Sequence, residues 1–206
     1  MPGKRINHYL TIEKISEGIF KDRGSKFIAI AFPVNDETEI REILGKVKKK
    51  YHDARHHCYA WKLGSHTIIT RFSDDGEPAN SAGKPILAQI ESSKLTNILV
   101  VVVRYFGGTL LGVGGLINAY RKACHEALKN ARIIKKHLFE VYHILFPYTE
   151  MNGVMKLIKT MNLEYYDHSI GQNCELKVKI PLEKSVEFIS QITRKKNIIS
   201  NLILNE

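Results

Sequence analysis

The sequence predicts an α+β protein built in two parts that meet near residue 136. Segments with the two-residue alternation of strands and segments with the 3.6-residue period of helices follow one another along the whole chain. The last 70 or so residues follow the order strand, helix, strand, strand, helix, strand, which is that of a ferredoxin-like βαββαβ unit. Charge separates the parts as well. Residues 1–136 hold 23 Lys and Arg against 13 Asp and Glu, a net charge of +10, whereas residues 137–206 hold 8 of each. We therefore expect domains at residues 1–135 and 136–206.

The elements of the first part follow from its apolar patterns and its turn residues. Asp36 is a residue type that caps helices, and it precedes a helical pattern that runs to about Lys50. The run 98–103 is apolar and rich in β-branched residues, as expected of a buried strand. In order, we expect strands at 8–14 and 25–34, a helix at 36–50, strands at 54–63 and 67–72, a helix at 81–95 and a strand at 97–106.

The clearest helix in the chain follows a glycine-rich turn after this strand. Its apolar residues fall on one continuous stripe at positions 116, 120, 123, 124, 127, 128 and 131. Beyond residue 136 the pattern resets. We expect strands at 138–146, 163–170, 175–181 and 198–204, helices at 150–161 and 182–195, and a hairpin turn at 171–173.

Several classes of protein are excluded by composition. No stretch approaches the ~20 apolar residues of a membrane helix, and the first residues, MPGKRINHYL, lack the apolar core of an export signal. The three cysteines are far apart and no C-x-x-C spacing occurs, so neither a disulfide framework nor a cysteine zinc site is indicated. We expect a cytoplasmic protein with no membrane contact. The positive charge of the first part favours an anionic partner such as RNA, a phosphorylated ligand or an acidic protein face.

The strongest local signal is the segment RYFGGTLLGVGG at residues 104–115. Its five glycines are expected where the backbone has a positive φ or approaches another group closely, and they are Gly107, Gly108, Gly112, Gly114 and Gly115. A helix that begins near Gly114 adds free N–H groups and its dipole, and Arg104 can bind a phosphate with its two-pronged guanidinium. The segment therefore predicts an anion site. A tight turn in which the glycines only permit packing explains the same residues.

A second group lies at HDARHHCYAW, residues 52–61. In a strand, Arg55, His57, Tyr59 and Trp61 share one face, and this mixture of cation and aromatic rings suits RNA. A metal site of His52, His56, His57 and Cys58 is weaker, because consecutive strand residues point apart. An ordinary strand with a buried Cys58 is the third interpretation.

An acidic turn, DDGE, follows at residues 74–77. Asp74, Asp75 and Glu77 are weak candidates for holding Mg²⁺ together with a phosphate. A solvated turn accounts for them equally well, and it is the interpretation favoured. We expect no cofactor. No nucleophile elbow, matched Cys/His pair or H-E-x-x-H is found, so we expect a binding protein without enzymatic activity.

These motifs carry a resemblance to a known family. HHCYAW at 56–61, DDGEP at 74–78, AGKPIL at 82–87 and above all VRYFGGTLLG at 103–112 resemble the signatures of the YigZ/IMPACT family, and in particular its bacterial two-domain members. The one departure is Asn80-Ser81, where members usually carry Gly-Thr. The resemblance implies a first domain with the ribosomal protein S5 domain 2-like fold and a second like the last domain of elongation factor G. It also implies a role in translation regulation, without implying a reaction.

The preferred hypothesis is a non-enzymatic translation regulator that binds RNA or the ribosome through its basic first domain. We expect Arg104, Arg121, Lys122, Lys84 and His57 on that surface. One rival is a nucleotide- or phosphate-binding enzyme or switch that uses the glycine-rich turn. Another is a protein–protein adaptor in translation control that docks through the neutral second domain. The sequence does not predict an oligomeric state.

Overall fold

The computed structural model describes residues 7–65, 67–195 and 197–205, and these residues form two compact units. One unit is Tyr9–Lys136, and the other holds the remainder of the described chain. Both units combine a β-sheet with helices, so the predicted α+β class is confirmed. No helix in the described ranges is long and apolar enough to span a membrane.

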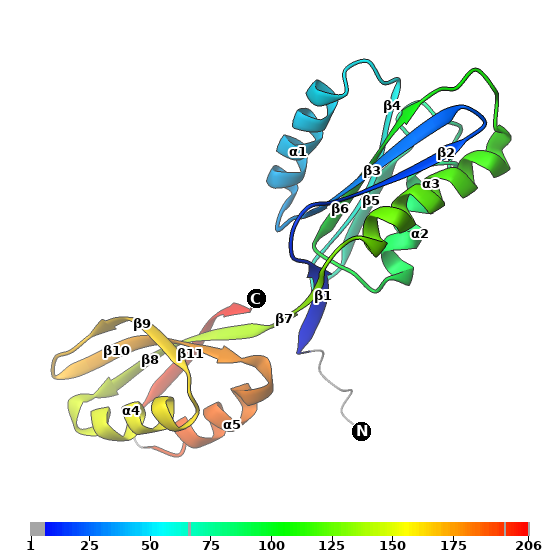
Figure 1. Ribbon diagram of the computed structural model, residues 1–206. Helices are drawn as coiled ribbons and strands as arrows, with labels where there is room; N and C mark the ends of the chain where they lie inside the picture. The colour runs from blue at the N-terminus through cyan, green and yellow to red at the C-terminus, as the bar shows by residue number, and fades with distance from the viewer. Residues whose placement is uncertain (1–6, 66, 196, 206) are drawn as a thin grey trace. The chain divides into compact units, whose positions relative to one another are not determined.

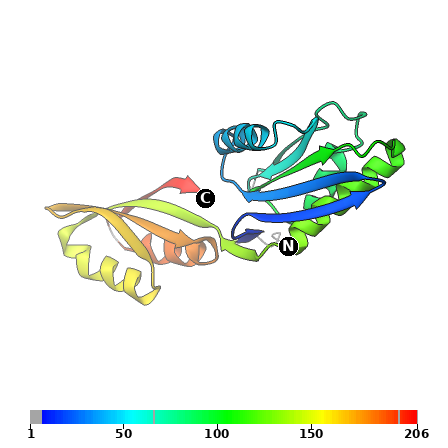
Figure 2. The ribbon, with the colours of Figure 1, turned by 45° about the horizontal axis from the view of Figure 1, so that its top comes forward.

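The first unit is built on a five-stranded antiparallel sheet with α1 on one face and α2 and α3 on the other (Figures 1 and 2). In sheet order, its strands are β2 (Ser16–Asp22), β3 (Ser25–Pro33), β6 (Ile98–Tyr105), β4 (His56–Leu63) and β5 (Ile69–Ser73). The helices are α1 (Glu37–Lys50), α2 (Gly83–Ser92) and α3 (Gly112–Lys129). Because β6 is central and covered on both faces, its run of Ile, Leu and Val is fully buried, as the sequence predicted.

Alternation along β3 divides the core into two layers. Phe27, Ala29 and Ala31 pack with α2 and α3, whereas Ile28 and Ile30 pack with α1. The predicted cap of α1 is also confirmed. The Asp36 carboxylate accepts hydrogen bonds from the Thr38 and Glu39 N–H groups, each at 2.8 Å.

Two strands of this unit were not predicted, β2 and β7 (Ile133–His137), the latter paired with β1 (His8–Ile12). The sequence of β2, SEGIFKD, is polar and contains a glycine, so it carries little strand signal. The structure explains that glycine. A Cβ at Gly18 would collide with the Ala127 nitrogen of α3, so the strand can lie against the helix only without a side chain there.

The second unit has the predicted ferredoxin-like order. Its strands β8 (Phe139–Pro147), β9 (Glu164–Ser169), β10 (Asn173–Pro181) and β11 (Ile199–Asn205) lie in the antiparallel order β11-β8-β10-β9. A short 3₁₀ turn (Tyr148–Glu150) leads into α4 (Met151–Thr160), and α5 (Leu182–Ile192) follows β10. Both helices cover the same face of the sheet (Figure 2).

Candidate functional site

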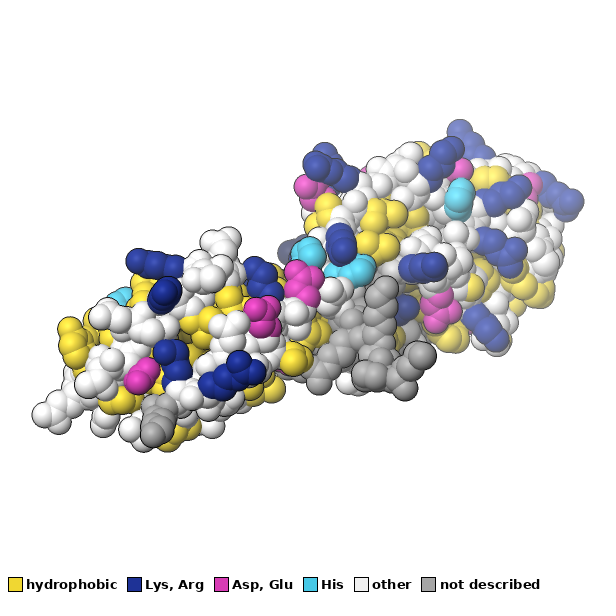
Figure 3. Space-filling model, turned by 90° about the horizontal axis from the view of Figure 1, so that it is seen from below, with side chains coloured by type: hydrophobic (Ala, Val, Ile, Leu, Met, Phe, Trp, Pro, Cys, Tyr) yellow, Lys and Arg dark blue, Asp and Glu magenta, His cyan; other side chains and the backbone are white. Residues whose placement is uncertain are grey.

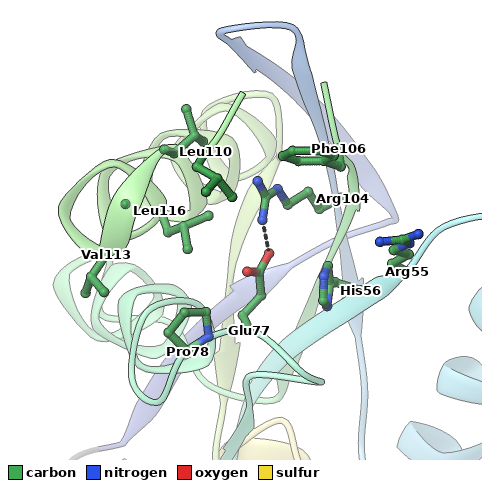
Figure 4. Close-up of a pocket in the computed structure, with 11 residues that line it drawn as sticks. Arg55, His56, Glu77, Pro78, Arg104, Phe106, Leu110, Val113 and Leu116 are labelled. Atoms are coloured by element: carbon green, nitrogen blue, oxygen red, sulfur yellow. Dashed lines mark hydrogen bonds and ion pairs between the residues drawn. The ribbon is translucent and has the colours of Figure 1, made fainter. Parts of the chain in front are cut away.

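A pocket of about 410 Å³ opens where β6 ends and α3 begins (Figure 4). It lies within the first unit, at the segment that the sequence analysis ranked first. Its walls come from the start of β4, the loop before α2, the end of β6 and the first turn of α3. The lining residues are Arg55, His56, Glu77, Pro78, Arg104, Phe106, Leu110, Leu111, Gly112, Val113 and Leu116.

The polar wall of the pocket is a buried ion pair between Arg104 and Glu77. Arg104 Nη1 donates to Glu77 Oε1 at 2.7 Å, and the two side chains are 7% and 3% exposed. The Tyr120 hydroxyl donates to the same oxygen at 2.7 Å. The Arg104 guanidinium also lies 5.5 Å from the ring centres of Phe27 and Phe106. Arg104 is therefore held on several sides, and Glu77 already has two donors directed at it.

One edge of the Arg104 guanidinium has no hydrogen bond. Its Nη1 is used by Glu77, but its Nε is buried and has no partner among the described residues. Figure 4 shows the guanidinium directed from β6 into the space between Phe106, Leu110 and Glu77. A buried donor without a partner lowers the stability of a protein by about 1–3 kcal/mol, and an oxyanion that accepted a hydrogen bond from this edge would remove that cost.

The amino end of α3 forms another wall of the pocket. The helix begins at Gly112, two residues before the predicted start, and no described side chain caps it, since Leu111 occupies the cap position. The first N–H groups of a helix have no partner within it and carry a partial positive charge. The pocket therefore brings together an uncapped helix end and a guanidinium with a free edge.

The five glycines of this segment have different roles. Gly108 and Gly112 adopt φ values of +85° and +68°, which residues with side chains rarely adopt. Gly107 is required for packing, because a Cβ there would collide with the backbone of Gly24 and Ser25 in the β2–β3 turn. At Gly115 a Cβ would come within 3.0 Å of the Leu111 Cβ, whereas at Gly114 it would meet nothing within 4 Å and no positive φ requires glycine. Packing and backbone geometry thus account for all of them except Gly114.

An apolar rim faces the polar wall, and its residues are not among the predicted site residues. Phe106, Leu110 and Val113 are 49%, 82% and 53% exposed, and all three line the pocket. Three large apolar side chains exposed around one cavity mark a surface suited to an apolar partner group. The available signal was the presence of Phe and Leu inside a glycine-rich turn, where polar residues are usual.

The face of β4 that the sequence predicts to stack on RNA bases is not exposed, so this prediction is wrong. His57, Tyr59 and Trp61 do share one face, but α1 covers it, and Trp61 is only 2% exposed. The ring of His57 is 3.0 Å from the Tyr51 carbonyl oxygen through Nε2. The alternation was correct, but it does not reveal which face a helix covers. Arg55 precedes the strand, is exposed and lines the pocket.

The remaining predicted cations lie on the surface away from the pocket lining. Lys84 on α2 and Arg121 and Lys122 on α3 are exposed. The Lys122 ammonium lies 5.1 Å from the centre of the Phe20 ring on β2. Figure 3 shows Lys and Arg side chains spread over the visible face of the first unit rather than gathered in one cluster. These residues and Arg104 thus occupy different environments, because Arg104 is buried.

The acidic side chains of the turn accept hydrogen bonds within the fold, although Gly76 and Pro78 beside them are exposed. Asp74 accepts hydrogen bonds from the Asn80, Ala82 and Gly83 N–H groups, and so folds the loop onto the start of α2. Asp75 accepts from the His57 N–H at 2.7 Å, and Glu77 pairs with Arg104. The three carboxylates are thus directed at different donors, and no group of three metal-binding side chains occurs in the described part of the chain. This arrangement does not favour the Mg²⁺ hypothesis, and the solvated-turn hypothesis is wrong for Glu77, whose side chain is 3% exposed.

The groups behind the polar wall are unsuited to nucleophilic attack. Burial raises the pKa of the Cys58 thiol and of the Tyr120 hydroxyl, and it also raises the pKa of Cys124. All three groups therefore stay protonated near neutral pH. What the geometry offers is binding: hydrogen-bond donors on one side of the pocket and apolar surface on the other.

Comparisons with known proteins agree with this organisation. The model of the Impact N-terminal domain matches residues 23–128, which include every residue that lines the pocket. The chain is 35% identical over 177 residues to "IMPACT family member YigZ" of Escherichia coli (strain K12), covering 82% of this chain and 84% of that protein. It is 29% identical over 192 residues to "IMPACT family member YvyE" of Bacillus subtilis (strain 168), covering 93% and 88%. A crystal structure described as that of an hypothetical protein aligns with a TM-score of 0.73 and 30% identity, over 98% of this chain and all of that one.

Proposed function

Because this chain belongs to the IMPACT family, we propose that it acts in the control of translation by binding RNA, and that it catalyses no reaction of its own. The family membership is the resemblance expected from the motifs at residues 56–61, 74–78, 82–87 and 103–112. RNA is the anionic partner that agrees best with a basic unit and with the absence, among the described residues, of a nucleophile poised to react.

The observation that carries this proposal is the charge of the first unit and its placement. The excess of ten positive charges lies entirely in residues 1–136. Arg23, Arg55, Lys84, Arg121 and Lys122 are exposed, and none of them forms an ion pair with another residue of the described ranges. Cations left without protein partners keep their full attraction for phosphates. Buried residues such as Trp61 are no longer part of the proposed RNA surface.

A titration with structured RNA at two salt concentrations tests the proposal. Each phosphate that is neutralised releases counterions, so log affinity should fall with log salt with a slope of about −0.7 to −0.9 per contact. Arg121→Gln should reduce that slope by about one if Arg121 meets a phosphate. Lys156→Gln is the matched control, since Lys156 is an exposed helical cation of the neutral unit. Failure to bind RNA even at low salt, or equal effects of the two substitutions, would contradict the proposal.

A further inference from the structure

Two independent groups that can donate hydrogen bonds to an anion lie at the pocket at the start of α3. One is the uncapped amino end of the helix, where Gly112 and Val113 line the cavity. The other is Arg104, which is 94% buried, lines the same cavity and has an Nε without a partner among the described residues. The Nε and Nη2 edge of a guanidinium fits two oxygens of one oxyanion.

Glu77 neutralises the charge of Arg104, so the attraction for an anion comes from hydrogen-bond donors rather than from a net positive charge. The Glu77 Oε1 accepts from both Arg104 and Tyr120. In such an arrangement the carboxylate orients the guanidinium, and the buried Nε on the opposite edge is left without a partner among the described residues. A phosphate monoester offers three acceptor oxygens and close to two negative charges at neutral pH, which uses both the guanidinium edge and the helix N–H groups. A phosphodiester inside an RNA strand carries one charge and two free oxygens and uses them less fully.

The second half of the pocket is apolar and sized for a ring. Phe106, Leu110 and Val113 line this half from the turn and from the first turn of the helix. Figure 4 shows Phe106 and Leu110 on either side of the Arg104 guanidinium. An aromatic side chain that is half exposed, as Phe106 is, is a usual stacking platform for a nucleobase. The volume of about 410 Å³ lies in the range of small-molecule sites and far below what a duplex needs.

We propose that this pocket binds one nucleoside 5′-monophosphate unit, with its phosphate at Arg104 and the first turn of α3 and its base against Phe106 and Leu110. The unit is either a free mononucleotide or the 5′-phosphorylated end of an RNA. The second form deepens the proposed function and rests on it, whereas the first stands without it. A neighbouring hollow of about 400 Å³ shares Arg55, Arg104 and Phe106 with the pocket and leaves room for the next nucleotide of a chain.

Calorimetric titration with adenosine 5′-monophosphate and with adenosine tests the phosphate half. The nucleotide should bind at least about tenfold more tightly, since hydrogen bonds to charged groups contribute about 1.5–3 kcal/mol. Val113→Glu places a carboxylate at the helix end, where it is compatible with the helix dipole but repels an anionic ligand. It should weaken nucleotide binding by at least about tenfold. Val186→Glu is the matched control, because Val186 is an exposed helical valine of the other unit. Equal affinity for the two ligands, no binding of either, or wild-type affinity in Val113→Glu would overturn the proposal.

Competition with short RNAs of one sequence decides between the two sources. If the 5′-phosphorylated RNA displaces the nucleotide and the 5′-hydroxyl RNA does not, the site holds an RNA end. If neither RNA displaces it, the site holds a free mononucleotide. RNA binding that depends on salt but not on Val113→Glu, with no nucleotide binding, would refute the pocket assignment and leave the proposed function standing. Nucleotide binding without any RNA binding would refute the proposed function and leave the pocket assignment standing. The Trp61 fluorescence of each variant confirms that the first unit is folded.

Discussion

Removing one charge of the buried pair between Arg104 and Glu77 should destabilise the first unit strongly. In Glu77→Gln the side chain keeps its shape, but the buried guanidinium loses its counter-charge. Both side chains are almost fully buried and their atoms approach to 2.7 Å, so solvent screens the pair little. Breaking such a pair costs about 3–5 kcal/mol. A domain of this size is usually stable by about 5–15 kcal/mol, so the variant should remain folded in the absence of denaturant.

The measurement is urea unfolding followed by tryptophan fluorescence. Trp61 is the single tryptophan of the chain and is buried in the first unit, so its signal reports on that unit alone. With a denaturant slope of about 2 kcal/mol/M, the midpoint of Glu77→Gln should fall by roughly 2 M. The midpoint of Arg104→Met should fall by a similar amount, because this change leaves Glu77 buried without its partner.

The double variant tests whether the effects of the two single changes on stability are coupled, as expected of an ion pair, or independent. Glu77→Gln with Arg104→Met buries no charge, and a methionine fits the space between Phe27 and Phe106. It should be at least about 2 kcal/mol more stable than the sum of the single changes predicts. Additive effects, or single changes that each cost less than about 1 kcal/mol, would refute the reasoning.

Three further predictions concern the same unit. Gly107→Ala should lower the free energy of unfolding by more than about 2 kcal/mol in urea, because its Cβ collides with the backbone of Gly24. Gly114→Ala should raise it by about 0.5–1 kcal/mol, because its Cβ meets open space. Asp74→Ala should lower the free energy of unfolding by about 1–2 kcal/mol through the loss of a helix-capping acceptor, measured in the same way. Burial and a raised pKa should leave Cys58 unreactive toward a thiol reagent at neutral pH until the unit unfolds, and rapid labelling of the native protein would contradict its placement.

The fold could be predicted from the sequence wherever local pattern and tertiary packing agree. Asp36 at the start of α1, the apolar run of β6 and the stripe on α3 each carry a signal that the structure reproduces. The βαββαβ order of strands and helices in the second unit could be predicted from its local patterns in the same way. The strand β2 was missed because its conformation depends on contact with α3 through Gly18, which is a property of the assembled fold rather than of the segment.

The candidate site could be located but not described from the sequence. The glycine-rich turn lies at the pocket, and Arg104, which the sequence predicts to bind an anion there, lines the pocket. Its burial could not be foreseen, because its partner Glu77 lies 27 residues earlier in a turn that composition alone marks as solvated. The stacking face of β4 failed for a related reason, since alternation shows that His57 and Trp61 share a face but not that α1 covers it.

The two halves of the pocket are anchored very differently. Arg104 belongs to the central and most deeply covered strand, and its position is set by Glu77, Tyr120 and two aromatic rings. Leu110 stands on an exposed turn between Gly108 and Gly112, both with positive φ, and Val113 is exposed on the first turn of α3, so substitutions at these two positions disturb little else. Changes in the turn can therefore alter the apolar half of the pocket, while the position of Arg104 is left unchanged.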